Sequence, residues 1–206
     1  HNLNKHDEAV ISYKKAVSIK PDYAEAYYNM GLVFRDQGKL DDAIKSYESF
    51  ILLRPNYADV YNNLGNLFQD LGKLEKSIIA FKKAISINPD YANAFCNMGI
   101  SLKNQGNYTC AVKAFKKAIL LKPNFAEAYN NMGNALRNQD KLKEAIIAYQ
   151  KAISIKPDYE SARAQKLFQQ ANICDWNIIK KDKNLIPTLG TKHKFVSPFT
   201  MLCIDD

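Results

Sequence analysis

The sequence predicts an all-α protein in which pairs of helices repeat along the chain as a solenoid. Proline recurs every thirty-four residues, at Pro21, Pro55, Pro89, Pro123 and Pro157. An Asn-x-Gly triplet recurs in phase with it, at Asn29/Gly31, Asn63/Gly65, Asn97/Gly99 and Asn131/Gly133. Between these markers, apolar residues follow the i, i+3, i+4, i+7 spacing of amphipathic helices. Repeats of this kind stack in a line, and each buries its apolar face on its neighbours.

Ending each period two residues after its proline divides the chain into one partial repeat and four full ones. The partial repeat is 1–23, and the first to fourth repeats are 24–57, 58–91, 92–125 and 126–159. A terminal capping helix is predicted at 160–176, followed by an irregular tail, 177–206, that is a linker or the start of another domain. The chain opens within a repeat, so we expect it to be a piece of a longer protein.

Each full repeat begins with a predicted first helix, which in the first repeat covers Ala24 to Gln37. Its apolar stripe consists of Tyr27, Met30, Gly31 and Phe34. Glycine inside a helix costs about 1 kcal/mol relative to alanine. Its return on every stripe therefore predicts a neighbouring helix that comes too close for a side chain.

A left-handed residue is expected to end each first helix. Gly38, Gly72 and Gly106 take this position, with Asn4 and Asp140 in the other two repeats. The second helix then runs to the proline, which cannot continue it. Asp22 with Glu25, and Asn124 with Glu127, have the spacing of a capping box for the next first helix.

A thirty-four-residue unit carrying an aromatic residue, Leu/Met-Gly, Tyr/Phe, Gly, Ala, Phe/Tyr, Ala and Pro in this order resembles the tetratricopeptide repeat. The resemblance covers residues 1 to about 159. It implies a right-handed superhelix whose first helices line a concave groove. Three residues depart from the pattern: Phe50 and Ser77 stand where alanine is preferred, and Asp140 where glycine is preferred. We expect Phe50 to push the adjacent helices apart locally.

The face of the first helix opposite the apolar stripe is rich in amides. Its members are Glu25, Asn29, Leu32 and Asp36; Asp59, Asn63, Asn66 and Asp70; Asn93, Asn97, Ile100 and Asn104; and Glu127, Asn131, Asn134 and Asn138. We call this the groove face, because the resemblance implies that it lines the groove. Asparagine is a mediocre helix former, yet it holds one position in all four repeats. We call Asn29, Asn63, Asn97 and Asn131 the asparagine column.

An asparagine side chain offers a donor and an acceptor together, so it can bond both the N–H and the C=O of an extended main chain. We therefore predict that the column, with Asn66 and Asn134, binds polypeptide segments of other proteins. The alternative is a recent duplication in which the column has not yet changed. Chaperone-binding tetratricopeptide domains hold a carboxylate with lysines and asparagines. The groove face lacks lysine, so we do not expect a partner of that kind. Arg35, Lys103 and Arg137 at its edge either favour acidic segments or are simply solvated.

The tail carries a second resemblance. Cys-Asp-Trp at Cys174 to Trp176 is followed by Val-Ser-Pro-Phe at Val196 to Phe199, then an apolar stretch and Asp-Asp. After repeats with a groove asparagine column, this order resembles the junction in O-linked N-acetylglucosamine transferase-like proteins. In that family the repeats present protein substrates to a glycosyltransferase region that uses a UDP-sugar. The resemblance implies that this chain is a substrate-presenting arm.

Other functions find little support in the sequence. The charge of +8 is spread along the chain, and its lysine pairs are interpreted as solvated helix faces, so we expect neither nucleic-acid nor membrane binding. Four cysteines without a CxxC pair indicate reduced thiols and a cytoplasmic location. His1, His6 and His193 have no spacing typical of a metal site or triad. We predict no catalytic residue, metal or cofactor, and hence no enzyme within this chain.

A structural or self-association module is the alternative function. The opening of the chain leaves the helix of the partial repeat without its partner helix. We expect this to expose Leu3, Val10, Tyr13 and Val17, and an open N-terminal end of this kind can pair with another copy.

Overall fold

The computed structural model describes residues 2–173, with side chains from residue 6 onward, and over that range it contains ten α-helices and no strand. The helices are α1 (Asn2–Ile19), α2 (Ala24–Asp36), α3 (Leu40–Leu53), α4 (Ala58–Asp70), α5 (Leu74–Ile87), α6 (Ala92–Asn104), α7 (Tyr108–Leu121), α8 (Ala126–Arg137), α9 (Leu142–Ile155) and α10 (Glu160–Asn172). The predicted all-α repeat architecture is confirmed for these residues. The predicted tail and its two motifs lie outside them.

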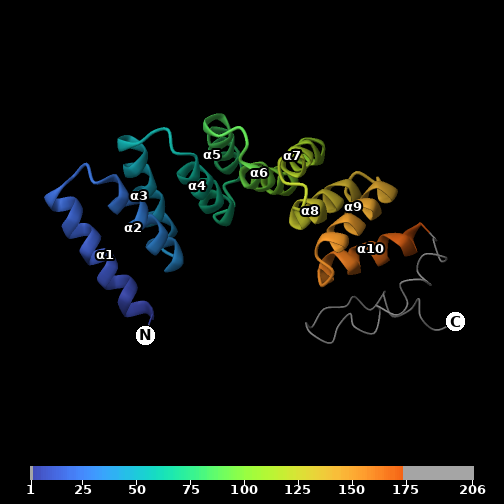
Figure 1. Cartoon of the computed structure of the whole chain (residues 1–206), viewed down its shortest axis with the longest axis horizontal. Coiled ribbons are helices and arrows are strands. Elements are labelled where there is room, and N and C mark those ends of the chain that lie inside the picture. The colour runs from blue at the N-terminus through green and yellow to red at the C-terminus, as the bar shows by residue number, and fades with distance from the viewer. Residues whose placement is uncertain (1, 174–206) are drawn as a thin grey trace. The chain divides into compact units, whose positions relative to one another are not determined.

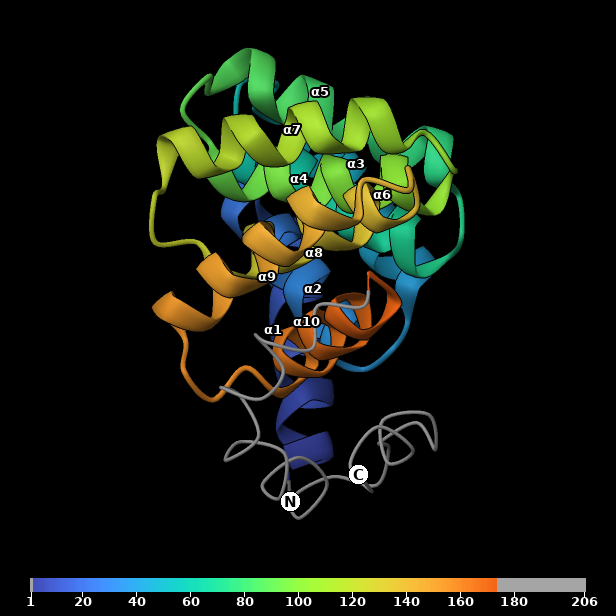
Figure 2. The ribbon, with the colours of Figure 1, turned by 90° about the vertical axis from the view of Figure 1, so that its right-hand side faces the viewer.

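The described residues divide into two compact bodies, 2–101 and 102–173, with the boundary inside α6. In the N-terminal body, α1, α2, α3 and α4 each pack on the next helix along the chain (Figure 1). In the C-terminal body, α8 packs between α7 and α9, and α10 lies beside α9 (Figure 2). Each second helix ends two residues before the proline of its repeat, as predicted.

The glycines of the apolar stripe mark the closest approach between the two helices of a repeat. Gly31 faces the ring of Tyr47, Gly65 faces Phe81, and Gly133 faces Tyr149. A Cβ on Gly133 would lie 2.6 Å from a carbon of the Tyr149 ring, which is too short for two carbon atoms. The predicted lack of room for a side chain is confirmed in these repeats.

Left-handed residues link the two helices of each repeat, as predicted. The φ angles are +73° at Gly38, +69° at Gly72, +83° at Gly106 and 57° at Asp140. Asn4 does not have this role, because it lies inside α1.

The predicted capping boxes are wrong. The N-cap of α2 is Tyr23 and that of α8 is Phe125, and neither helix has a side-chain cap. Asp22 lies one residue before the N-cap, where its backbone carbonyl accepts a hydrogen bond from the Ala24 N–H.

Replacing Asp140 with glycine is expected to raise the free energy of unfolding by about 0.5–1 kcal/mol, because a Cβ disfavours the left-handed conformation. Gly106→Asp makes the reverse change at the same position of the third repeat, and should lower stability by a similar amount. Urea denaturation followed by circular dichroism measures both. A loss of stability in Asp140→Gly would contradict this account.

The apolar side of α1 is largely covered. Val10 is only 7% exposed and belongs to the core that contains Met30 and Phe34. Tyr13 and Val17 are half-buried against the same core. The expectation that these three residues are exposed is therefore wrong, because the stripe of α1 packs on α2, and the argument for self-association loses its basis. Leu3 lies outside the described side chains.

Candidate functional site

The groove face of α2, α4, α6 and α8 is open in both bodies. None of its sixteen positions is buried. Residues at its ends, such as Asp36 and Asp70, are exposed, whereas its centre is half-buried. All four asparagines of the column, together with Asn66 and Asn134, are half-buried. Each of these amides is therefore accessible, while neighbouring atoms restrict its side chain.

Neighbouring repeats orient the column asparagines within the N-terminal body. The Asn97 Nδ2 donates to Asn62 Oδ1 at 3.1 Å. Asn63 likewise contacts the preceding repeat, because its amide lies beside the hydroxyl of Tyr28. Burial raises the pKa of Tyr28, and the Asn63 amide offsets part of that rise. In both cases a column asparagine contacts a residue of the preceding repeat, namely the one that stands immediately before the column asparagine of that repeat. Asn97 keeps its Oδ1 and one N–H for another partner.

Asn62 and Asn130 were missed by the sequence analysis. They are 8% and 7% exposed, and sit between the open face and the apolar stripe. The signal that identifies them in the sequence is that amides occur at certain positions in every second repeat. Amides stand before the column at Asn62 and Asn130, and three residues after it at Asn66 and Asn134, in the second and fourth repeats only. The first and third repeats have Tyr28 and Leu32, and Cys96 and Ile100, at these positions.

A buried tyrosine holds Asn134 in place. The Tyr149 hydroxyl donates to Asn134 Oδ1 at 2.9 Å. Burial raises the pKa of Tyr149 to about 12, so the hydroxyl keeps its proton at neutral pH. The amide N–H groups of Asn134 remain available to a ligand. Asn66 has no such support, because Phe81 occupies the equivalent position of its repeat.

The arginines at the edge of the groove face are already paired. Arg35 forms an ion pair with Asp36 at 2.9 Å. Arg137 donates to Gln165 Oε1 at 2.8 Å and to Asn138 Oδ1 at 3.3 Å. Arg35 is thereby neutralised by a carboxylate, whereas the partners of Arg137 are neutral amides that leave its charge in place.

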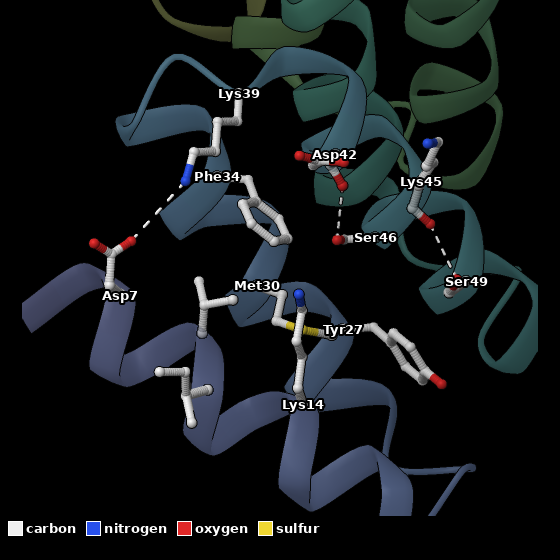
Figure 3. A pocket seen from close by; sticks show the side chains of 12 residues that line it. Asp7, Lys14, Tyr27, Met30, Phe34, Lys39, Asp42, Lys45, Ser46 and Ser49 are labelled. Atoms are coloured by element: carbon white, nitrogen blue, oxygen red, sulfur yellow. Dashed lines mark hydrogen bonds and ion pairs between the residues drawn. The ribbon is translucent and has the colours of Figure 1, made fainter.

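A separate cavity of about 580 Å³ lies among α1, α2 and α3 (Figure 3). Val10, Met30 and Phe34 supply its apolar lining, and an ion pair of 3.9 Å between Lys39 and Asp7 borders it. Its lining includes no residue of the asparagine column. The cavity is therefore distinct from the candidate groove.

Among the described residues, no three His, Cys, Asp or Glu side chains lie close enough to hold a metal ion. The helices of the described region are each too short or too polar to cross a bilayer.

Comparison with known structures shows which proteins share this fold. MamA is 29% identical, with a TM-score of 0.72 over 76% of this chain and 91% of that chain. YrrB, described as a TPR protein with an unusual peptide-binding site, is 24% identical, with a TM-score of 0.71 over 80% of this chain and 85% of that chain. The first TPR of Spaghetti (RPAP3), bound to the HSP90 peptide SRMEEVD, is 20% identical, with a TM-score of 0.56 over 57% of this chain and 93% of that chain. The last two show the fold alone.

Family models identify the repeats themselves. A model of the TPR repeat matches residues 1–38, 31–72, 65–106 and 101–140, and a model of the tetratricopeptide repeat matches residues 126–159. No curated protein matches the chain. The matches together span all four full repeats, and the chain belongs to the tetratricopeptide repeat family.

Proposed function

We propose that this chain is a protein–protein interaction scaffold, which binds extended polypeptide segments through the asparagine column. The observation that carries the proposal is the half-exposed amide at one position of every full repeat, on a face with no buried member. Two of the similar structures are described with peptide-binding roles, YrrB by its binding site and RPAP3 by its bound peptide.

Hydrogen bonds within and between repeats favour this role because they preorganise the amides. Asn97 is oriented by Asn62 before any ligand arrives, and Asn134 is oriented by Tyr149. A group that is already ordered loses less conformational entropy on binding. Each amide contact would contribute about 0.5–1.5 kcal/mol, so binding would be weak per contact and cumulative. Recognition of the main chain would make it tolerant of sequence.

Duplication alone explains the column less well. The neighbouring positions have changed between repeats, as at Leu32, Asn66 and Ile100, whereas the column has not. The hydrogen bond between Asn97 and Asn62 offers a structural reason for one asparagine, so the test must separate the two roles. Asn62→Ala removes the supporting acceptor and leaves the column complete.

Replacing Asn63, Asn97 and Asn131 together with alanine should weaken binding of extended polypeptides at least tenfold, because three contacts of about 0.5–1.5 kcal/mol are lost. Fluorescence anisotropy with labelled peptides measures the affinity, and circular dichroism checks the fold. Asn62→Ala should have a smaller effect. Lys82→Ala with Gln150→Ala, both on exposed faces of second helices, should have none. Unchanged affinity in a folded triple variant would rule out the column as a receptor.

We further propose that the scaffold is the substrate-presenting arm of a glycosyltransferase-like protein. This rests only on the residue order around Cys174–Trp176 and Val196–Phe199, outside the described residues. A UDP-sugar-binding transferase region after Asp206 in the full-length sequence would support it, and an unrelated domain there would contradict it. The proposed cytoplasmic location rests on the cysteine spacing alone.

A further inference from the structure

Two aromatic residues of the first repeat depart from the other repeats. Tyr28 stands where the others have asparagine or cysteine, and Phe50 stands where they have alanine. The two rings lie together, with centroids 5.7 Å apart. Phe50 is 3% exposed, so the space it needs is filled by this packing. The two departures therefore form one local feature that the first repeat alone possesses.

Tyr57 completes this feature, which we call the aromatic cluster (Tyr28, Phe50 and Tyr57). Its ring centroid is 5.3 Å from Phe50 and 6.1 Å from Tyr28, in edge-to-face arrangements. Phe50 forms the buried base, while Tyr28 is half-buried and Tyr57 is 42% exposed. The cluster borders the groove face, because the Tyr28 hydroxyl lies beside Asn63 of the column. A side chain of a polypeptide held by Asn63 can reach it.

The net charge beside the cluster is negative. Asp59 lies close enough to Tyr28 to act on its hydroxyl, and it is exposed. Its Oδ1 accepts a hydrogen bond from Tyr91 at 2.6 Å, and it forms no ion pair with any residue in the described range. Its Oδ2 is available to a ligand. Tyr91 orients the carboxylate without neutralising it.

Arg35 also acts on the Tyr28 hydroxyl, but less strongly than Asp59 does, and the other charges nearby are in ion pairs. Arg35 is paired with Asp36 at 2.9 Å, and Glu25 is paired with Arg54 at 2.8 Å. Asp59 therefore determines the sign of the charge that a ligand side chain meets there. This sign is opposite to the net charge of the chain, which is +8.

We propose that Tyr28, Tyr57 and Asp59 form a subsite for an arginine or lysine side chain of the bound polypeptide. Aromatic ring faces attract cations, and a carboxylate adds a charge-assisted hydrogen bond. Arginine fits better than lysine, because its planar guanidinium stacks on rings and presents several donors at once. The subsite rests on the proposed function, since the column would hold the main chain beside it.

Extended peptides that differ only in one central residue test this subsite. With the full chain in fluorescence anisotropy, the arginine peptide should bind about three- to tenfold more tightly than its glutamine counterpart, and the glutamate peptide more weakly. Asp59→Asn should lower the arginine-to-glutamine ratio, because the carboxylate is neutralised while the rings remain. Asp70→Asn, at the other exposed end of α4, should leave the ratio as it is.

A second variant guards against loss of the fold. Tyr28→Asn combined with Phe50→Ala introduces the residues that this chain itself uses in its second and fourth repeats, and it should also reduce the preference for arginine. If all peptides bind equally while the triple asparagine variant weakens them all, the subsite is overturned and the proposed function stands. If the triple variant changes nothing, the proposed function is overturned as well. A phenylalanine peptide that binds more tightly than arginine, regardless of Asp59→Asn, would overturn the cation preference.

Discussion

Replacing Gly65 with alanine is expected to lower the free energy of unfolding by about 1–3 kcal/mol. The sign is diagnostic, because glycine to alanine inside a helix ordinarily raises stability by about 1 kcal/mol. Here the new methyl group would fall on the ring of Phe81, which is 0% exposed and has no free space to move into. Urea denaturation monitored by circular dichroism measures the change.

A second substitution shows whether this contact is the cause. Phe81→Leu shortens the side chain opposite Gly65, so the double variant should be more stable than the sum of the two single changes implies, by about 1 kcal/mol. Asp70→Ala, at an exposed position of the same helix, should have little effect. A Gly65→Ala protein more stable than the parent would show that the two helices are not in close contact there.

Replacing Ser101 with alanine is expected to lower the free energy of unfolding by about 1–3 kcal/mol, because it breaks a chain of buried hydrogen bonds. The Ser101 hydroxyl is 0% exposed and donates to Gln69 Oε1 at 3.0 Å. Its only hydrogen is used there, so in the 2.7 Å contact with Ser77 the hydroxyl of Ser77 must be the donor. Ser101→Ala leaves that donor buried without a partner.

The Ser77 variants provide the control. Ser77→Ala removes the buried donor and introduces the residue found at this position in the other repeats, Ala43, Ala111 and Ala145. Ser77→Ala should lower the free energy of unfolding less than Ser101→Ala does. The double variant should be no less stable than Ser101→Ala alone. Effects that add in the double-mutant cycle would contradict the chain of hydrogen bonds.

The helices and the open face were predictable because they depend on periods within a single repeat. The first helix was expected over Ala24 to Gln37 and is found over Ala24 to Asp36. The stripe that carries Gly65 packs as its spacing indicates, and the opposite face has no buried member.

Contacts between repeats were not predictable in this way. A helical wheel of one repeat does not show that Asn97 meets Asn62, or that Asn63 meets Tyr28. These contacts depend on which side chains two successive repeats bring together. Ser77 was recognised as a departure from the repeat pattern, but its partner Ser101 could be identified only in the structure.

The alternation of amide-rich and amide-poor repeats decides how the chain can be shortened or lengthened. Deleting residues 58–91 alone would remove Asn62, the hydrogen-bond acceptor of Asn97. Asn97 would then follow the first repeat, which has Tyr28 at the position of Asn62. Deleting 58–125 would keep an amide-rich repeat after an amide-poor one, with Asn131 following Tyr28 as Asn63 does now. The interchangeable building block of this protein is thus a pair of repeats, and engineered versions should be cut or extended in pairs.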